Sequence, residues 1–452
     1  MSSKLTFWGG AGEVTGANFL LEFDGAKVLV DCGSHEQERV CGGKDLQPFP
    51  YMANDIKALF ITHAHQDHIG RVPRLVRSGF RGVIYSTNAT KDLAAVMFDD
   101  ALGVMQQEMK QFGCEALYER EDVDRALELW QGREYHAPFD VEDASVEFLD
   151  AGHILGSALV KLTRQSRSIV FSGDIGNTPE PILRDCEKPE GASYLVMESV
   201  YGDRVHEDVA ERKDILRTAI EDTENRGGVL LIPSFSLERT QVLLYEMNDL
   251  LESKAIRPIH VYLDSPLATR VTDVFRKYPA LFNEKARERA ADEGDLFSFK
   301  ELTVIGTPGE SHEIFRKPNP KIIIAGAGMS GGGRVRAHEK EYLGSPHTSV
   351  LLVGYQSPGS LGRRILDGQK NVRIDDMNID MRARVSFLGG YSGHADREQL
   401  LDFVEGAGEH LKRVFVTMGE PQASLYLAQR IKDFLGRDAI VPTRGQSFDI
   451  DW

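Results

Sequence analysis

Short apolar runs separated by turns dominate the first 200 residues of the chain. The runs NFLLEF (18–23) and KVLVDCG (27–33) flank Asp24-Gly25, which predicts a β-hairpin. Further strand-like runs follow at 58–65, 83–87, 145–152, 158–163, 168–174 and 194–199. Residues 89–132 instead begin with apolar side chains at helical spacing, and we predict a long helical region there.

After Glu198 the pattern changes to a regular alternation of helices and strands. ERKDILRTAIEDTENRGG (211–228) predicts a helix that its glycines end, and VLLIP (229–233) predicts a buried strand. The alternation continues through 238–253, 259–265, 321–326 and 349–355. Such a pattern predicts an open, mostly parallel α/β sheet.

The length and the changes of pattern together predict the domain organisation. A chain of 452 residues is too long for one ordinary core, so we expect two compact units. The pattern changes once more near residue 378. We therefore expect a first domain over 1–198, an inserted α/β domain over 199–377, and a return segment over 378–452 that completes the first domain.

Composition excludes several classes of protein. The formal charge of −16 argues against a protein that coats nucleic acid non-specifically, because phosphate contacts need clustered Lys and Arg. No apolar run approaches the roughly 18 residues of a membrane helix, and the amino terminus lacks a signal-peptide pattern. The few scattered cysteines predict neither a disulfide framework nor a thiolate zinc site: Cys32, Cys41, Cys114 and Cys186. We expect a cytoplasmic protein without membrane contact.

The strongest chemical signal is the run THAHQDH (62–68), which follows the apolar segment ALFI. One loop at the end of a strand brings three imidazoles and one carboxylate into a small volume: His63, His65, Asp67 and His68. This mixture favours zinc over calcium or magnesium, which prefer oxygen ligands. The alternative is a polar loop without a metal, but so dense a cluster is costly to pack unsupported.

Two further residues extend this cluster. His153 in AGHILGSA and Asp174 in FSGDIG each come directly after a strand-like run, where chain ends can meet one cleft. Alone, either residue is more typical of a structural turn. Together with the histidine run they are predicted ligands, and Asp174 can bridge two ions because a carboxylate has two oxygens.

These residues resemble a known family. Asp31 in LVDCG, the HxHxDH run, His153 and Asp174 match in order the signature of the metallo-β-lactamase fold, an αββα sandwich. The later segment resembles the inserted β-CASP α/β domain of the CPSF-like RNA nucleases, so the resemblance covers the whole chain. Three motifs carry this second likeness: ESVYG (198–202), GMSGGGRVRAH (328–338) and SGHAD (392–396).

The resemblance implies a specific metal centre. One ion would be held by His63, His65, His153 and Asp174, and the other by Asp67, His68, Asp174 and His394. A hydroxide that bridges the two ions would be the nucleophile. By the same resemblance Asp67 would orient that hydroxide. Asp31 would fix a ligand histidine, although a strand-end turn aspartate explains Asp31 equally well.

The resemblance also suggests groups for the leaving oxygen and for the phosphate. His338 would be the general acid, and Glu198 would hold its tautomer. Ser330 and Arg334, with the glycines between them, would donate to phosphate oxygens. Without the resemblance, His338 is better explained as a helix-surface histidine and Glu198 as an ordinary strand-end acid. A basic stretch over 312–340 would border an RNA path, although such a run is usually a solvated face.

The leading hypothesis is therefore a zinc-dependent endoribonuclease that hydrolyses single-stranded RNA. Zinc is expected at two ions per chain, with manganese as the alternative, and the family suggests a homodimer. Hydrolysis of a small thioester or lactone is a second enzymatic hypothesis, against which the large insert weighs. DNA cleavage is a third, although that branch carries a valine where His394 stands here. A non-catalytic RNA-binding scaffold is the fourth, and it would have lost metal ligands.

Overall fold

The two ends of the chain form one unit, and the segment between them forms another. Unit 1 contains Met1–Val205 and His394–Trp452, and unit 2 contains His206–Gly393. The structure is a computed structural model that describes residues 3–35, 43–206, 209–357 and 359–452. No helix among the described residues is both long and apolar enough to cross a membrane.

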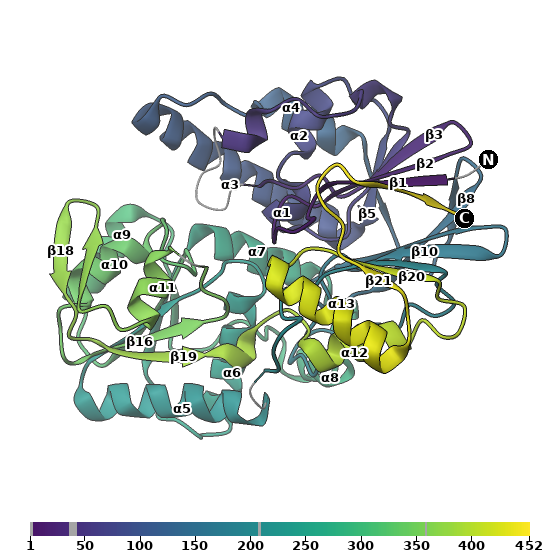
Figure 1. The fold of residues 1–452 in the computed structure, drawn as a ribbon. Coiled ribbons are helices and arrows are strands. Elements are labelled where there is room, and N and C mark those ends of the chain that lie inside the picture. Colours follow the sequence, from purple (N-terminus) through teal and green to yellow (C-terminus); the bar gives the residue numbers. More distant parts are fainter. Residues whose placement is uncertain (1–2, 36–42, 207–208, 358) are drawn as a thin grey trace. The chain divides into compact units, whose positions relative to one another are not determined.

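Unit 1 contains two seven-stranded sheets within the described residues. The first has the order β22 (Ser447–Ile450), β1 (Ser3–Gly9), β2 (Asn18–Phe23), β3 (Ala26–Val30), β4 (Ala58–Phe60), β5 (Val83–Thr87), β6 (Trp130–Arg133). The second has the order β21 (Ala439–Ile440), β20 (Arg413–Val416), β11 (Tyr194–Met197), β10 (Arg167–Phe171), β9 (Ala158–Arg164), β8 (Ala144–Asp150), β7 (Phe139–Val141). Both chain ends meet here, because β22 pairs antiparallel with β1 (Figure 1).

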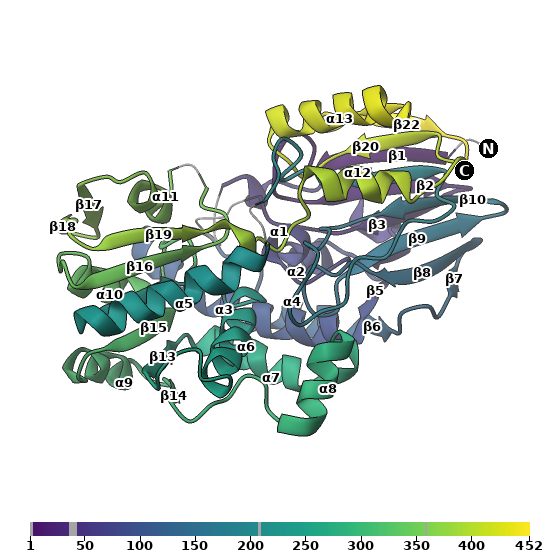
Figure 2. The same cartoon turned by 90° about the horizontal axis from the view of Figure 1, so that it is seen from below.

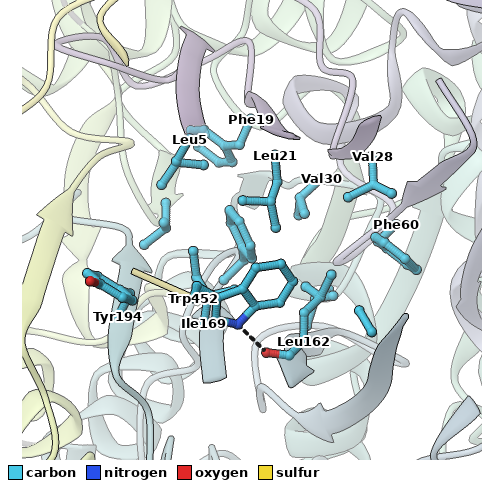
Figure 3. Close-up of a cluster of buried hydrophobic side chains, with 14 of the residues drawn as sticks. Leu5, Phe19, Leu21, Val28, Val30, Phe60, Leu162, Ile169, Tyr194 and Trp452 are labelled. Atoms are coloured by element: carbon cyan, nitrogen blue, oxygen red, sulfur yellow. Dashed lines mark hydrogen bonds between the residues drawn. The ribbon is translucent and has the colours of Figure 1, made fainter. Parts of the chain in front are cut away.

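Apolar side chains from the inner faces of the two sheets form the central core of unit 1. Phe19 and Val28 come from the first sheet, and Leu162 and Ile169 come from the second (Figure 3). The indole of Trp452 enters the same core and donates a hydrogen bond to the carbonyl oxygen of Leu162. The ring centroids of Phe19 in the first sheet and Phe171 in the second lie 6.1 Å apart, as expected when two sheets pack face to face.

Helices cover the outer faces of unit 1, which completes the predicted αββα sandwich. The helices are α1 (Gln66–Ile69), α2 (Val72–Arg77), α3 (Asn88–Phe112), α4 (Arg120–Glu128), α12 (Arg397–Glu405) and α13 (Pro421–Leu435). Figure 2 shows α12 and α13 beside β20 of the second sheet. Their apolar side chains, such as Phe403 and Leu427, pack in one cluster with Leu195 and Val414 of that sheet.

The hairpin predicted around Asp24-Gly25 is confirmed, since β2 and β3 pair antiparallel and Phe23 faces Ala26. Both turn residues have positive φ, as a two-residue hairpin turn requires. The long helical region predicted over 89–132 was wrong in its extent. Helix α3 ends at Phe112, and Gly113 caps it in the left-handed conformation with a φ of +66°. Helix α4 starts only at Arg120.

Unit 2 is built on a six-stranded sheet whose paired strands are all parallel, as the alternating pattern predicts. Its order is β14 (Leu302–Val304), β13 (His260–Asp264), β15 (Lys321–Ala325), β12 (Val229–Pro233), β16 (Thr348–Val353), β19 (Arg384–Leu388). The helices are α5 (Val209–Arg226), α6 (Arg239–Glu252), α7 (Pro266–Lys277), α8 (Glu284–Glu293), α9 (Pro308–Glu313), α10 (Val335–Tyr342) and α11 (Leu361–Leu366). Strands β17 (Asn371–Ile374) and β18 (Met377–Asp380) form a separate hairpin.

The units divide at other positions than the change of pattern near residue 378 suggests. Strand β19 pairs in parallel with β16, and this pairing places residues 384–388 in unit 2. The chain returns to unit 1 only at His394. The apolar segment RVSFL contains no signal that distinguishes one sheet from the other, which explains the difference.

The cysteines differ from one another in chemistry. Cys32 is a buried free thiol whose pKa burial raises to about 12, and Cys186 is a free thiol as well. Cys114 is disulfide-bonded, which the scattered spacing did not predict. Cys41 lies outside the described residues.

Candidate metal centre

The residues of the predicted centre lie where strands of unit 1 end. Asp31 follows β3, the run 62–68 follows β4, and Asp174 follows β10. His153 lies in the turn between β8 and β9, and His394 precedes α12. Residues far apart in the sequence therefore meet because the strands that carry them end at one place.

Four side chains form the first group. Ligand atoms of His63, His65, His153 and Asp174 all lie within 4.8 Å of one another. Asp174 Oδ2 is 3.4 Å from His63 Nε2 and 3.5 Å from His153 Nε2. His65 Nδ1 is 3.1 Å from His63 Nε2 and 3.2 Å from His153 Nε2. The family resemblance implies that these four residues hold one ion, and the structure brings their ligand atoms together.

The residues predicted for the other ion also lie around the carboxylate of Asp174. His68 Nε2 is 3.3 Å from Asp174 Oδ1 and 3.9 Å from Asp67 Oδ2. His394 Nδ1 is 3.8 Å from Asp174 Oδ2. Asp174 thus has histidines at both of its oxygens, as a carboxylate shared by two ions would need.

Asp31 holds the loop that carries the histidines. Its Oδ1 accepts from the backbone amide of Thr62, and its Oδ2 accepts from the Thr62 hydroxyl, both at 2.9 Å. Oδ2 also lies 2.8 Å from His68 Nδ1. This contact fixes the histidine so that Nε2 faces Asp174. Asp31 is completely buried, and its φ is +58°.

Backbone hydrogen bonds join the neighbouring loops tightly. Cys32 N donates to His68 O, and Ala17 N donates to Asp67 O. A Cβ on Gly33 would lie only 1.5 Å from the carbonyl oxygen of Asp67, so this position requires glycine. These contacts join the loop from 31 to 34 directly to the loop from 66 to 68.

The electrostatics of the first group suit metal ligation. Burial lowers the pKa of His63, and it lowers the pKa of His65 and His153 further, which favours the neutral form of these imidazoles. Burial alone would raise the pKa of Asp174, but the histidines around it hold that pKa well below its usual range. Neutral imidazole and ionised carboxylate are the forms that bind a divalent cation.

Two unsatisfied buried atoms point to the same conclusion. His68 Nε2 and Asp174 Oδ1 are buried without a hydrogen-bond partner, although they face each other. A buried polar atom without a partner costs free energy, which a bound cation would recover. Although burial opposes it, Asp174 and Asp31 raise the pKa of His68 well above its usual range. The site thus draws positive charge, and the residues fit divalent cations.

Glu198 lies beside this centre in unit 1. Its Oε1 accepts from Ile175 N at 2.7 Å and lies 3.1 Å from His394 Nδ1, while its Oε2 accepts from Val200 N. Glu198, Asp174 and His394 form a second group of potential ligand atoms. Against the opposing effect of burial, the carboxylates of Glu198 and Asp174 raise the pKa of His394 to about 9. Glu198 therefore contacts His394, whereas the family resemblance implied a place for it beside His338.

The carboxylate that binds His338 is Asp264, in unit 2. His338 Nε2 is 2.7 Å from Asp264 Oδ2, and both side chains are completely buried. Asp264 also accepts from Ser311 Oγ at 2.5 Å. A general acid must present a nitrogen to its substrate. Nε2 of His338 faces Asp264, and its Nδ1 is buried without a hydrogen-bond partner among the described residues.

The predicted phosphate contacts lie in the same unit. Arg334 directs Nη1 to Asp264 Oδ1 at 2.6 Å and Nη2 to the carbonyl oxygen of Gly306 at 2.9 Å. Ser330 is completely buried in the glycine-rich loop, with φ of +59°. Sequence reasoning missed Asp264, although an aspartate at the end of the buried strand HVYLD was a usable signal.

The basic stretch over 312–340 is largely neutralised within unit 2. Arg336 and Lys340 both pair with Asp375, and Arg316 pairs with Glu313. Lys321 is buried and donates to two carbonyl oxygens. The positive charge that this stretch could offer to RNA is therefore smaller than its composition suggests.

Known protein families match successive parts of the chain. Residues 20–199 match the metallo-beta-lactamase superfamily domain, and residues 240–365 match the Beta-Casp domain. Residues 378–442 match the Zn-dependent metallo-hydrolase RNA specificity domain.

Individual relatives cover nearly the whole chain. Ribonuclease TTHA0252 of Thermus thermophilus is 35% identical over 94% of this chain and 95% of its own. Transcription termination factor FttA of Methanosarcina mazei is 29% identical over 95% of this chain and 68% of its own. The crystal structure of a protein of unknown function from Enterococcus faecalis V583 matches over 100% of both chains, with a TM-score of 0.60 and 14% identity. That likeness shows the fold alone.

Proposed function

We infer that this chain, which belongs to the β-CASP branch of the metallo-β-lactamase superfamily, is a nuclease. Specifically, we propose that it is a zinc-dependent endoribonuclease acting on single-stranded RNA. Membership makes the protein a metal-dependent hydrolase; the identity and number of the ions and the form of the RNA belong to the proposal. The observation that carries it is the convergence of His63, His65 and His153 on Asp174.

We propose the two sets of zinc ligands that the family resemblance implies, and the contacts around Asp174 support them. His63, His65, His153 and Asp174 would hold one ion, and Asp67, His68, Asp174 and His394 would hold the other. Three neutral imidazoles and one carboxylate are a typical zinc donor set. Manganese is the alternative ion, since histidine and carboxylate also bind it.

The side chains of the centre have separate tasks in hydrolysis. When bound, the ions would lower the pKa of water and so supply a hydroxide nucleophile at neutral pH. Asp67 is 27% exposed, so its carboxylate can reach solvent and accept a hydrogen bond from the attacking water. Asp31 and Glu198 keep His68 and His394 in fixed orientations. Such preorganisation lowers the cost of reaching the transition state.

RNA is the proposed substrate for two reasons. The relative from Thermus thermophilus is named a ribonuclease, and residues 378–442 match a domain described by RNA specificity. A small thioester or lactone would not need an insert as large as unit 2, and DNA cleavage has no comparable support. We also propose a cytoplasmic location and, from the family resemblance, a homodimer, which sedimentation analysis would test.

Elemental analysis and cleavage assays test the proposal together. Purified protein should contain close to two zinc ions per chain, and a strong chelator should abolish cleavage of labelled single-stranded RNA. Single-stranded DNA and a thioester, assayed in parallel, should react far more slowly. Asp174→Ala serves as the inactive control, because it removes a ligand of both proposed ions. At most one ion per chain, unchanged after zinc is added, would contradict the two-ion centre.

A further inference from the structure

We propose that Asp150 is a positioning residue of the metal centre, acting through the turn that carries His153. Asp150 is the last residue of β8 and is only 6% exposed. Its Oδ1 accepts a hydrogen bond from the backbone amide of Gly152 at 3.0 Å. The inference rests on the proposed metal centre, because a turn matters to function only if His153 is a ligand.

The bond from Gly152 to Asp150 closes a local turn. An aspartate that accepts from the amide two residues ahead stabilises a tight turn in place of a regular strand. Gly152 has a φ of +64°, which glycine adopts without strain. The carboxylate therefore sets the direction in which the chain leaves β8, and His153 is the next residue.

This turn also contacts the other ligand loops. Gly176 N donates to Ala151 O at 2.8 Å, and Gly176 lies two residues after Asp174. Gly176 in turn forms an isolated β-bridge with His394. A Cβ on Gly176 would lie 2.0 Å from the carbonyl oxygen of Gly152, so the two backbones are in direct contact. A displaced turn would consequently disturb Asp174 and His394 as well as His153.

The segment after Asp174 fixes Asp150 from the other side. Arg184 Nε lies 3.1 Å from Asp150 Oδ2. Asp150 N donates to Glu187 Oε1, and Glu187 N donates back to Asp150 O, both at 2.9 Å. These contacts hold the carboxylate of Asp150 so that its Oδ1 faces the backbone amide of Gly152. Among the described residues, the groups of potential ligand atoms do not include Asp150, which separates positioning from ligation.

Two conservative variants separate the acceptor from the charge. Asp150→Asn loses the charge but keeps an oxygen within reach of Gly152 N. Asp150→Glu keeps the charge but moves its oxygens one methylene further along. Asp140→Glu on β7 is the matched control, because Asp140 is exposed. Zinc affinity is measured by competition with a chromophoric chelator, and the absorption spectrum of the cobalt-loaded protein reports ligand geometry.

We expect Asp150→Glu to weaken zinc binding by about 10–100-fold and to change the cobalt spectrum, as loss of an orienting partner does. Asp150→Asn and Asp140→Glu should bind zinc within about threefold of the wild type on that scale. Wild-type affinity and spectrum in Asp150→Glu would overturn the inference, even if thermal stability fell. Equal losses in Asp150→Asn and Asp150→Glu would also overturn it, since charge would then be the cause. Wild-type protein that binds no zinc would overturn the metal centre itself and, with it, this role.

Discussion

Asp31 Oδ2 lies 2.8 Å from His68 Nδ1, and both side chains are completely buried. The same carboxylate accepts from the amide and the hydroxyl of Thr62, at the start of the histidine run. A carboxylate that accepts from one imidazole nitrogen leaves the other nitrogen free to bind a cation. Of the two explanations that the sequence left open for Asp31, the geometry favours the support of a ligand histidine.

Asp31→Ala should therefore weaken binding at one of the two proposed ions. His68 would lose the partner that fixes its ring, and Thr62 would lose two hydrogen bonds. We expect zinc affinity at that position to fall by about 10–100-fold. Chelator competition measures the loss, and Asp55→Ala, which removes an exposed carboxylate paired with Lys27, is the control. Unchanged stoichiometry and affinity in Asp31→Ala would contradict the supporting role.

We expect Glu339 to make the free energy of unfolding depend on pH. It lies on α10 with no exposed surface, and burial raises its pKa from 4.5 to about 8, against smaller opposing effects of Ser330 and Arg336. Between these two values the unfolded chain releases the proton and the folded protein keeps it. The free energy of unfolding should therefore fall as pH rises from 4.5 to 8, by on the order of 1 kcal/mol per pH unit.

Glu339→Gln should remove this dependence. The variant should be more stable than the wild type at pH 8 and differ little from it at pH 4.5, as measured by denaturant unfolding. Glu341→Gln, an exposed position on the same helix, should leave the wild-type profile intact. Parallel pH profiles for the wild type and Glu339→Gln would show that the carboxyl group of Glu339 ionises normally in the folded protein.

Much of the fold follows from local patterns, because alternation and turn chemistry act over a few residues. The hairpin at Asp24-Gly25 and the parallel sheet of unit 2 are examples. Two features of the fold could not be predicted from the sequence. The end of α3 depends on Gly113, a single glycine within a continuous apolar pattern. The pairing of β19 depends on a partner strand distant in the sequence, and no local signal identifies it.

Only part of the candidate metal centre could likewise be predicted from the sequence. The histidine run is dense enough to be found from its composition, and His153 and Asp174 follow from their positions after strands. The partners of the buried acids were not predictable, because they depend on tertiary packing. Glu198 contacts His394, and Asp264 contacts His338. The role proposed for Asp150 could not be predicted either, since it depends on the contact between Gly152 and Gly176.

Gly33→Ala should disrupt the support of the metal loop. The added Cβ would lie 1.5 Å from Asp67 O and 2.8 Å from His68 N, both of them backbone atoms that cannot move alone. We expect a loss of about 1–3 kcal/mol or more in the free energy of unfolding, together with weaker zinc binding. Gly103→Ala is the matched control, because it lies in α3 with open space around it. It should stabilise the protein by about 0.5–1 kcal/mol.

Two roles for His338 predict different results. As an anchor it supports Asp264, which also holds Ser311 and Arg334. As the general acid that the sequence suggests, it would give a proton to the leaving oxygen. The complete burial of the imidazole and the 2.7 Å contact of its Nε2 with Asp264 lead us to expect the anchor.

His338→Ala should accordingly lower the free energy of unfolding by about 1.5–3 kcal/mol, the cost of losing a hydrogen bond to a charged group. Zinc content should be unchanged, and cleavage of RNA and of a substrate with a good leaving group should decrease by the same factor. Ser311→Ala removes another partner of Asp264 and should reproduce this pattern. A general acid would act differently, because its loss lowers RNA cleavage by about 10²–10⁴-fold while the good leaving group needs no proton. Selective recovery of that substrate in His338→Ala, but not in Ser311→Ala, would therefore reject the anchor and establish the acid.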